Sequence, residues 1–141
     1  MRATRRLFAA FFVLGLGLAL PALAQDGIAI KSFRSTAAEG SHVFCDATGS
    51  TAKKAPCFLR TLYVTTGATG GWLMTFDAIT APANGAVQPI ECVVAPSTNT
   101  TSIDFGPTSE PYVTGLTAVF STTGCHTLTV SNTAFFKGRS Q

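Results

Sequence analysis

The stretch YVTGLTAVFSTTGCHTLTVSNTAFF (112–136) carries the pattern that decides the fold class. Val, Thr, Leu and Phe dominate two runs, 112–121 and 126–136, and the small residues STTG (121–124) separate them. β-branched and aromatic runs on either side of a tight turn are typical of antiparallel strands that pair. The alternation of apolar residues changes parity near Gly115 and again before Phe135, which predicts a β-bulge at each point.

The same pattern extends toward the N-terminus, and no window after residue 25 shows the apolar spacing of a helix. Asn84-Gly85 predicts a type I′ hairpin turn, and TGATGG (66–71) predicts a glycine-rich hairpin connection. About eight short strands separated by turns predict an all-β protein, an antiparallel β-sandwich of the jelly-roll or Ig-like kind. The other six expected strands are 28–34, 41–46, 57–66, 71–78, 87–95 and 101–105.

The first 24 residues have the three parts of a secretory signal peptide. Arg2, Arg5 and Arg6 precede an uncharged apolar run, 7–20, and Ala22-Leu23-Ala24 forms a small-x-small cleavage site. The apolar run is short for a membrane span, which needs about 20 residues, although an uncleaved anchor is the alternative. We therefore expect a signal peptide at 1–24 and one exported domain at 25–141, periplasmic or extracellular, with no membrane span.

Charge argues against a nucleic-acid partner. The whole chain has 10 Lys and Arg against 7 Asp and Glu, but three arginines lie in the leader, so the remaining charges balance. Only Lys53 and Lys54 are neighbours in the sequence, whereas nucleic-acid binding needs several cations on one surface. A net charge near zero also permits self-association into a homo-oligomer.

Four cysteines lie in the exported part, and an even number in an oxidising compartment predicts two disulfides. Three pairings are open to four cysteines. We favour Cys45–Cys57, which closes the short polar loop 46–56, together with Cys92–Cys125.

The sequence contains no pattern that predicts a catalytic, cofactor or metal site. Cys125 and His126 are adjacent, so in a strand their side chains point to opposite faces. The cysteine separations of 12, 35 and 33 residues match no zinc motif. Asp77 and Glu91 could lie across a hairpin as a pair of acids, but their place in the alternation favours two solvent-facing carboxylates.

Aromatic residues offer a binding hypothesis instead. Trp72 shares the face of its strand with Met74 and Phe76, which predicts a core tryptophan. Tyr63 and Tyr112 are the predicted ligand contacts. We therefore expect an exported, non-catalytic protein that acts by binding or assembly on a protein or glycan partner. A small secreted or periplasmic hydrolase and a carbohydrate-binding module are the alternatives.

Two segments carry a resemblance to known proteins. GWLMTFDAITAPANGAVQPIECVVAP (71–96) and TGLTAVFSTTGCHTLTVSNTAFFKG (114–138) resemble segments of small β-rich proteins of bacteriophages, prophages and rhizobia-like bacteria. Some of those proteins are thought to be virion components. The resemblance covers about the last half of the chain and implies a bacterial or phage-related β-rich fold and, by analogy, a structural role.

Overall fold

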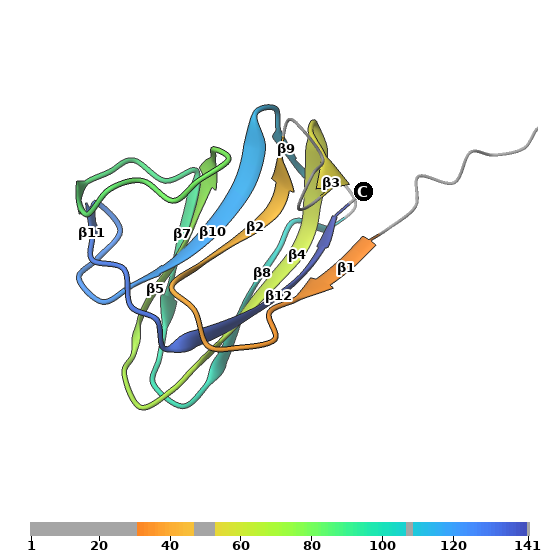
Figure 1. The fold of residues 1–141 in the computed structure, drawn as a ribbon. Helices are drawn as coiled ribbons and strands as arrows, with labels where there is room; N and C mark the ends of the chain where they lie inside the picture. Colours follow the sequence, from red (N-terminus) through yellow and green to blue (C-terminus); the bar gives the residue numbers. More distant parts are fainter. Residues whose placement is uncertain (1–30, 47–52, 107–108, 141) are drawn as a thin grey trace, which may run out of the picture.

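The computed structural model describes residues 31–46, 53–106 and 109–140, and in this part of the chain all regular structure is β-strand (Figure 1). The expected strands 41–46 and 57–66 are confirmed with the same bounds. The strands are β1 (Lys31–Arg34), β2 (Ser41–Asp46), β3 (Lys53–Lys54), β4 (Cys57–Thr66), β5 (Gly71–Asp77), β6 (Gly85–Ala86), β7 (Glu91–Ala95), β8 (Thr100–Asp104), β9 (Glu110–Tyr112), β10 (Gly115–Ser121), β11 (Thr127–Leu128) and β12 (Ala134–Ser140).

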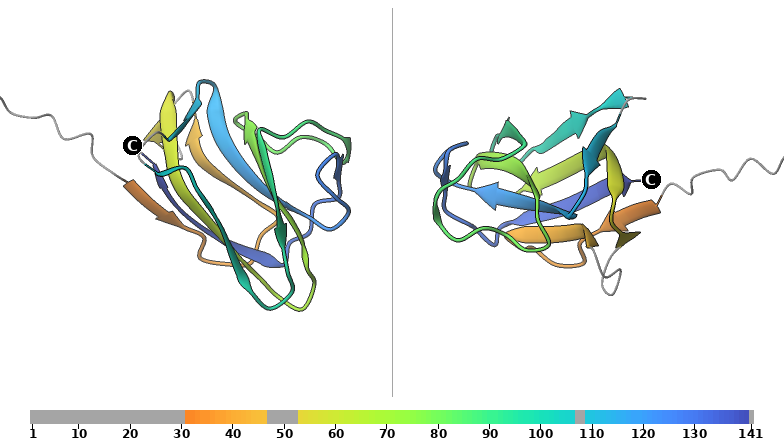
Figure 2. Two further views of the ribbon diagram at one scale, coloured as in Figure 1. Left: turned by 180° about the vertical axis from the view of Figure 1, so that it is seen from behind. Right: turned by 90° about the horizontal axis from the view of Figure 1, so that it is seen from above.

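Two sheets pack face to face (Figures 1 and 2). Sheet A has the order β1-β12-β4-β8, with β9 also paired to β4, and sheet B has the order β3-β2-β10-β5-β7. The predicted antiparallel β-sandwich is therefore confirmed. A short third sheet joins β6 to β11.

The strand order distinguishes between the two kinds of sandwich that we expected. β1 pairs with β12, β2 with β10, β4 with β8, and β5 with β7, so the pairs are nested in the sequence like one long hairpin. Rolling such a hairpin brings its two ends together as two antiparallel sheets, which is the arrangement of a jelly roll. The fold is therefore a jelly roll, with β3, β6, β9 and β11 as short additions.

The main core lies between the two sheets. Apolar side chains at alternate positions of β4, β10 and β12 point into it, because successive side chains of a strand point to opposite faces. Gly138 of β12 lies under the ring of Phe44, and a Cβ there would come within 2.8 Å of the ring. The buried members are Phe44, Cys45, Cys57, Leu59, Leu62, Val64, Leu73, Ala95, Ile103, Tyr112, Leu116, Ala118, Phe120, Ala134 and Phe136.

A second, smaller core covers the outer face of sheet B. Met74, Phe76 and Val119 point away from sheet A and pack against Leu128 of β11. Trp72 is half-buried and packs against the same cluster, so its predicted place beside Met74 and Phe76 is confirmed. The connection 78–90 and β11 lie together over this face, on the side of the molecule away from β1 (Figure 1).

The expected strand 112–121 is two strands. The predicted irregularity near Gly115 is confirmed, because the register of β10 with β2 shifts between Leu116 and Thr117. Residues 110–112 pair with β4 in sheet A, whereas residues 115–121 pair with β2 and β5 in sheet B. One carboxylate oxygen of Asp77 accepts hydrogen bonds from the N–H groups of Thr114 (2.7 Å) and Gly115 (3.0 Å). The region of the parity change therefore contains a move between sheets in addition to the register shift, and the hydrogen bonds to Asp77 hold that move in place.

The expected strand 126–136 is also two strands. β11 belongs to the cover of sheet B, a single bridge joins Val130 to Ser121, and β12 begins at Ala134 in sheet A. The predicted register shift before Phe135 is therefore a second move between sheets. β12 continues to Ser140, beyond the expected end, because it pairs on both sides, with β1 and β4.

The two predicted hairpin turns are not hairpins. Among the described residues Asn84 has no positive φ, as a type I′ turn would need. Its side-chain oxygen instead accepts a hydrogen bond from the Val130 N–H (3.0 Å), and Gly85 begins β6. Residues 66–71 connect β4 of sheet A to β5 of sheet B, so they cross between the sheets.

The predicted signal peptide, 1–24, lies outside the described residues, as do the first three residues of the expected strand 28–34. Within the described ranges, no helix is long and apolar enough to cross a membrane.

Candidate functional site

Both favoured disulfides are present. Cys45 bonds to Cys57 between β2 and β4, and Cys92 bonds to Cys125 between β7 and the loop after β10. Disulfides of this kind form and persist in oxidising compartments. All four cysteines are therefore oxidised, and none of them offers the thiolate that a nucleophile or a metal ligand requires.

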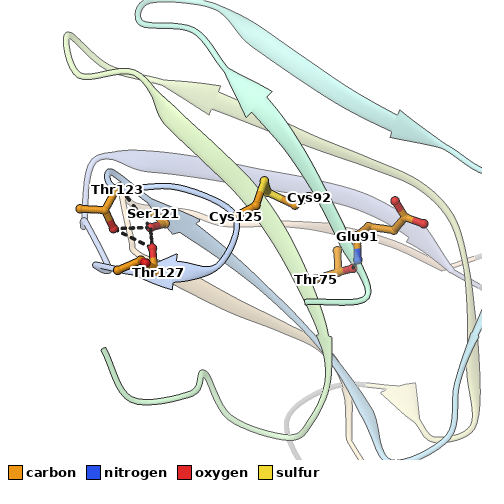
Figure 3. Close-up of a disulfide and its surroundings, with 7 residues drawn as sticks. All are labelled: Thr75, Glu91, Cys92, Ser121, Thr123, Cys125 and Thr127. Atoms are coloured by element: carbon orange, nitrogen blue, oxygen red, sulfur yellow. Dashed lines mark hydrogen bonds between the residues drawn. A yellow bond between two sulfur atoms is a disulfide. The ribbon is translucent and has the colours of Figure 1, made fainter. Parts of the chain in front are cut away.

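Hydrogen bonds of serine and threonine hydroxyl groups hold the STTG turn (121–124) in place (Figure 3). The Ser121 hydroxyl accepts the Thr129 N–H (3.1 Å), and the Thr123 hydroxyl donates to the Thr127 carbonyl (2.7 Å). Cys125 leaves this turn toward Cys92, across the outer side of β5. These bonds fix a loop and its disulfide, which is a structural role.

His126 lies on the surface beside a shallow depression of about 520 Å³ that Ala86, Val87 and Gln88 also line. The other histidine, His42, contacts Glu39 through Nδ1 at 2.7 Å and packs against the ring of Phe44. Within the described ranges no three His, Cys, Asp or Glu side chains gather as metal ligands.

Tyr112 was predicted as a ligand contact, and this prediction is wrong. The side chain is fully buried in the main core, and its hydroxyl donates a hydrogen bond to Thr75 Oγ1 at 2.8 Å. Burial raises the pKa of the Tyr112 phenol above its ordinary range. Tyr112 therefore links sheet A to sheet B and is inaccessible to a ligand.

Tyr63 is placed differently and remains a candidate. It points outward from the centre of sheet A and is half-buried among its neighbours on that face. The pairing register sets Lys137 of β12 directly opposite it on one side and Ser102 of β8 opposite it on the other. Tyr63 therefore belongs to a continuous surface made by four strands.

We call this surface the sheet A face. Its outward residues form three rows across β1, β12, β4 and β8, because directly paired residues point to the same side of a sheet. The rows are Ser32, Arg139, Thr61 and Asp104, then Arg34, Lys137, Tyr63 and Ser102, then Phe135, Thr65 and Thr100.

A depression of about 430 Å³ lies over the β1 side of the sheet A face. It is lined by Arg34, Thr65, Phe135, Phe136 and Lys137. Phe135 is 46% exposed, so a large ring faces solvent among cations and hydroxyl groups. Concave sites with an apolar surface and a few polar groups are the usual form of small-ligand sites.

Among the residues that the structure describes, the cations of the sheet A face have no acidic partners. In the described part of the chain no Asp or Glu pairs with Arg34, Lys137 or Arg139. Arg34 and Lys137 are instead direct cross-strand neighbours, and like charges in that position destabilise a sheet.

The two acids considered for hydrolysis belong to sheet B and not to this depression. Asp77 holds the backbone after β9, and Glu91 begins β7, where its N–H donates to Thr75 Oγ1 (3.2 Å). Neither residue lines the depression on the sheet A face.

Sequence reasoning missed Arg34, Lys137 and Phe135. A period-two signal exists, because Phe135, Lys137 and Arg139 alternate with the inward Phe136 and Gly138. That signal was hidden by the expected end of the strand at 136. Nothing local in the sequence connects Arg34 with Lys137, which lies 103 positions later.

No protein-family model, curated protein or solved structure matches this chain. The resemblance of 71–96 and 114–138 to phage and bacterial proteins therefore stays a prediction.

Proposed function

We propose that this chain is an exported, non-catalytic binding protein and that it holds a glycan on the sheet A face. The observation that carries the proposal is the open depression in which Phe135 lies among hydroxyl and cationic side chains, with Tyr63 beside it as the cross-strand neighbour of Lys137. A sugar ring has apolar C–H faces that stack on aromatic rings, and hydroxyl groups that bond to polar side chains. The sheet A face offers both kinds of contact.

A glycan fits this surface better than a folded protein partner does. The core of a protein–protein interface is apolar and depleted of charge. The sheet A face has Phe135 as an isolated exposed ring, and Thr65, Thr100 and Ser102 surround the aromatic residues with hydroxyl groups. Thr65 and Thr100 hydroxyls are 2.9 Å apart, so they already form an ordered polar pair.

Export is supported by the leader-like sequence of residues 1–24 and by the two disulfides. A non-catalytic role is supported by the roles of the candidate catalytic groups. Cys125 is oxidised, and Asp77 holds a chain crossover. A jelly roll by itself decides nothing, since the fold occurs in lectins and in viral capsids alike.

The test is binding of purified residues 25–141, with both disulfides formed, to an array of neutral and acidic glycans. We expect a set of bound glycans, and we expect Phe135→Ala or Tyr63→Ala to weaken their binding about two- to tenfold, because aromatic stacking contacts are worth roughly 0.5–1.5 kcal/mol beyond burial. Val94→Ala is the matched control, because Val94 is 63% exposed on sheet B. No binding to any glycan, or equal loss with Val94→Ala, would contradict the proposal.

A further inference from the structure

We infer that the glycan is acidic and that Arg34 and Lys137 hold its carboxylate or phosphate group. This inference rests on the proposed function and names the ligand class of the same face. It comes from the cross-strand pair of Arg34 and Lys137, because two like charges in direct register destabilise a sheet.

Arg34 and Lys137 are paired in the register of β1 with β12, so their side chains leave the sheet side by side. Both are exposed, and no acid of the described residues neutralises either one. Like charges directly opposite one another cost a sheet stability. Local rules of this kind are broken mainly at functional or strained sites.

The chemistry of the two side chains matches an oxygen anion. The guanidinium group presents a planar fork of N–H donors that fits the two oxygens of a carboxylate or phosphate, and the ammonium group adds a compact positive charge. Both groups line the same depression, with Thr65 as a further hydroxyl. An anion between them would relieve their mutual repulsion and gain charge-assisted hydrogen bonds.

The aromatic residues place the rest of the ligand. Tyr63 is the direct neighbour of Lys137 on the side away from Arg34, and Phe135 lies two residues before Lys137, roughly 7 Å along β12. A sugar ring that carries the anion would therefore lie beside one or both aromatic rings. A volume of about 430 Å³ is within the range of small-ligand pockets, which is roughly 300–1,000 Å³, and suits one or two sugar units.

The rest of the face sets a direction for the ligand. Asp104 of β8 is the one acid in the three rows, and it lies on the opposite edge from Arg34. Arg139 extends the positive charge along β12, between Ser32 and Thr61. The acidic group would therefore lie over β1 and β12, and the neutral part of the glycan would point toward β8.

The test compares glycan pairs that differ only in charge. Oligogalacturonate and its methyl ester form one pair, and sugar phosphates and their unphosphorylated forms make the second, within an array that also holds neutral glycans. A poly-glutamate peptide tests whether any anion suffices. We expect the bound glycans to carry an anionic group, with affinity at least tenfold above that of the neutral partner.

Variants locate the contact. Arg34→Gln and Lys137→Gln should each weaken binding about tenfold and flatten its dependence on salt concentration, because each removes one screened charge–charge contact. Lys54→Gln, on β3 of sheet B, is the matched control and should change neither quantity. Circular dichroism of each variant would check that the fold is intact.

The outcomes separate this inference from the proposed function. Neutral glycans that bind as tightly as acidic ones would overturn the inference and leave the proposed function standing. Poly-glutamate binding as tight as that of the best glycan would overturn the choice of a glycan. No binding to any glycan would overturn both proposals.

Discussion

The outer faces of the two sheets differ in solvent exposure, although both belong to strands of one sandwich. On sheet B, the segment 78–90 and β11 cover Met74, Phe76 and Val119, and the Cys92–Cys125 disulfide closes the cover. On sheet A no described element lies over the middle row of Arg34, Lys137 and Tyr63. One face is a second core, and the other is open to solvent.

This difference shows that the residue types at the outward positions of a strand depend on whether another segment covers them. Outward positions of β5 are the apolar Trp72, Met74 and Phe76, because the chain returns to cover them. On β10, Val119 is joined by the buried Thr117 and Ser121, whose hydroxyls donate to carbonyls of the covering segments. Outward positions of β12 are Phe135, Lys137 and Arg139, which suit contact with water or with a ligand. The predictions that follow test whether the covered face contributes stability and the open face contributes binding.

The largest effect on stability should come from the cover. Leu128 is 1% exposed and packs against the outward side chains of sheet B, so Leu128→Ala should lower the free energy of unfolding by about 2–5 kcal/mol. Phe135→Ala on the open face should change it by less than about 0.5 kcal/mol. Chemical denaturation measures both values. Equal losses would contradict the distinction between the two faces.

Removing the Cys92–Cys125 disulfide should have the next largest effect. Its loop spans 33 positions, and Cys92→Ser with Cys125→Ser should cost about 2–4 kcal/mol. Amide hydrogen exchange should then become faster in β6 and β11. The amides of β4 and β12 should stay protected, because a partial opening of the cover leaves the sandwich folded. Uniform loss of protection throughout would show that the cover and the sandwich unfold as one unit.

Tyr112 and Tyr63 lie on opposite sides of sheet A, so only the buried Tyr112 should contribute to the pH dependence of the free energy of unfolding. This effect should be smaller than that of removing the disulfide. Tyr112→Phe removes the hydrogen bond to Thr75 and should cost about 0.5–1.5 kcal/mol at neutral pH. Because burial raises the pKa of Tyr112 in the folded state, the buried phenol stabilises the fold fully below the unfolded-state value of about 10.

That contribution is lost as pH rises above about 10. The wild-type protein should therefore lose stability between pH 9 and pH 11 more steeply than Tyr112→Phe does, as measured by urea denaturation at each pH. Tyr63→Phe is the control for removal of a phenol on the open face. A wild-type profile identical to that of Tyr112→Phe would contradict this account.

The smallest effect concerns the paired cations. Lys137→Gln should raise the free energy of unfolding at low salt by a few tenths of a kcal/mol, on the order of one unfavourable cross-strand pair. Arg139→Gln should give no such gain, because its cross-strand neighbours are Ser32 and Thr61. A loss of stability in Lys137→Gln would show that Lys137 supports the fold instead of opposing it.

Much of the fold could be predicted from local patterns. The bounds of β2 and β4 were predicted without error, and those of β5 to within one residue, because each is a run of Val, Thr, Leu and aromatic residues that is bounded by turn-forming residues. The pairing of the four cysteines was also predicted, from an even number and one short loop. The moves between sheets at 113–114 and before Ala134 could not be predicted, because a change of parity is the same signal for a bulge and for a crossover.

The candidate site divides in the same way. Tyr63 was found from its residue type, but the same reasoning chose Tyr112, whose hydroxyl bonds to Thr75 inside the sandwich. The exposure of a tyrosine depends on which segments pack over its strand, and the local sequence does not indicate which segments these are. Arg34 and Lys137 meet only because β1 and β12, from the two ends of the described chain, pair with each other.

The sequence by itself determined the class of this protein: short alternating runs can bury one side only as strands, and an even number of cysteines can pair. The tertiary structure alone decided which outer face is covered and which cations are neighbours. Both follow from contacts between residues far apart in the chain, where rolling a long hairpin brings its ends together.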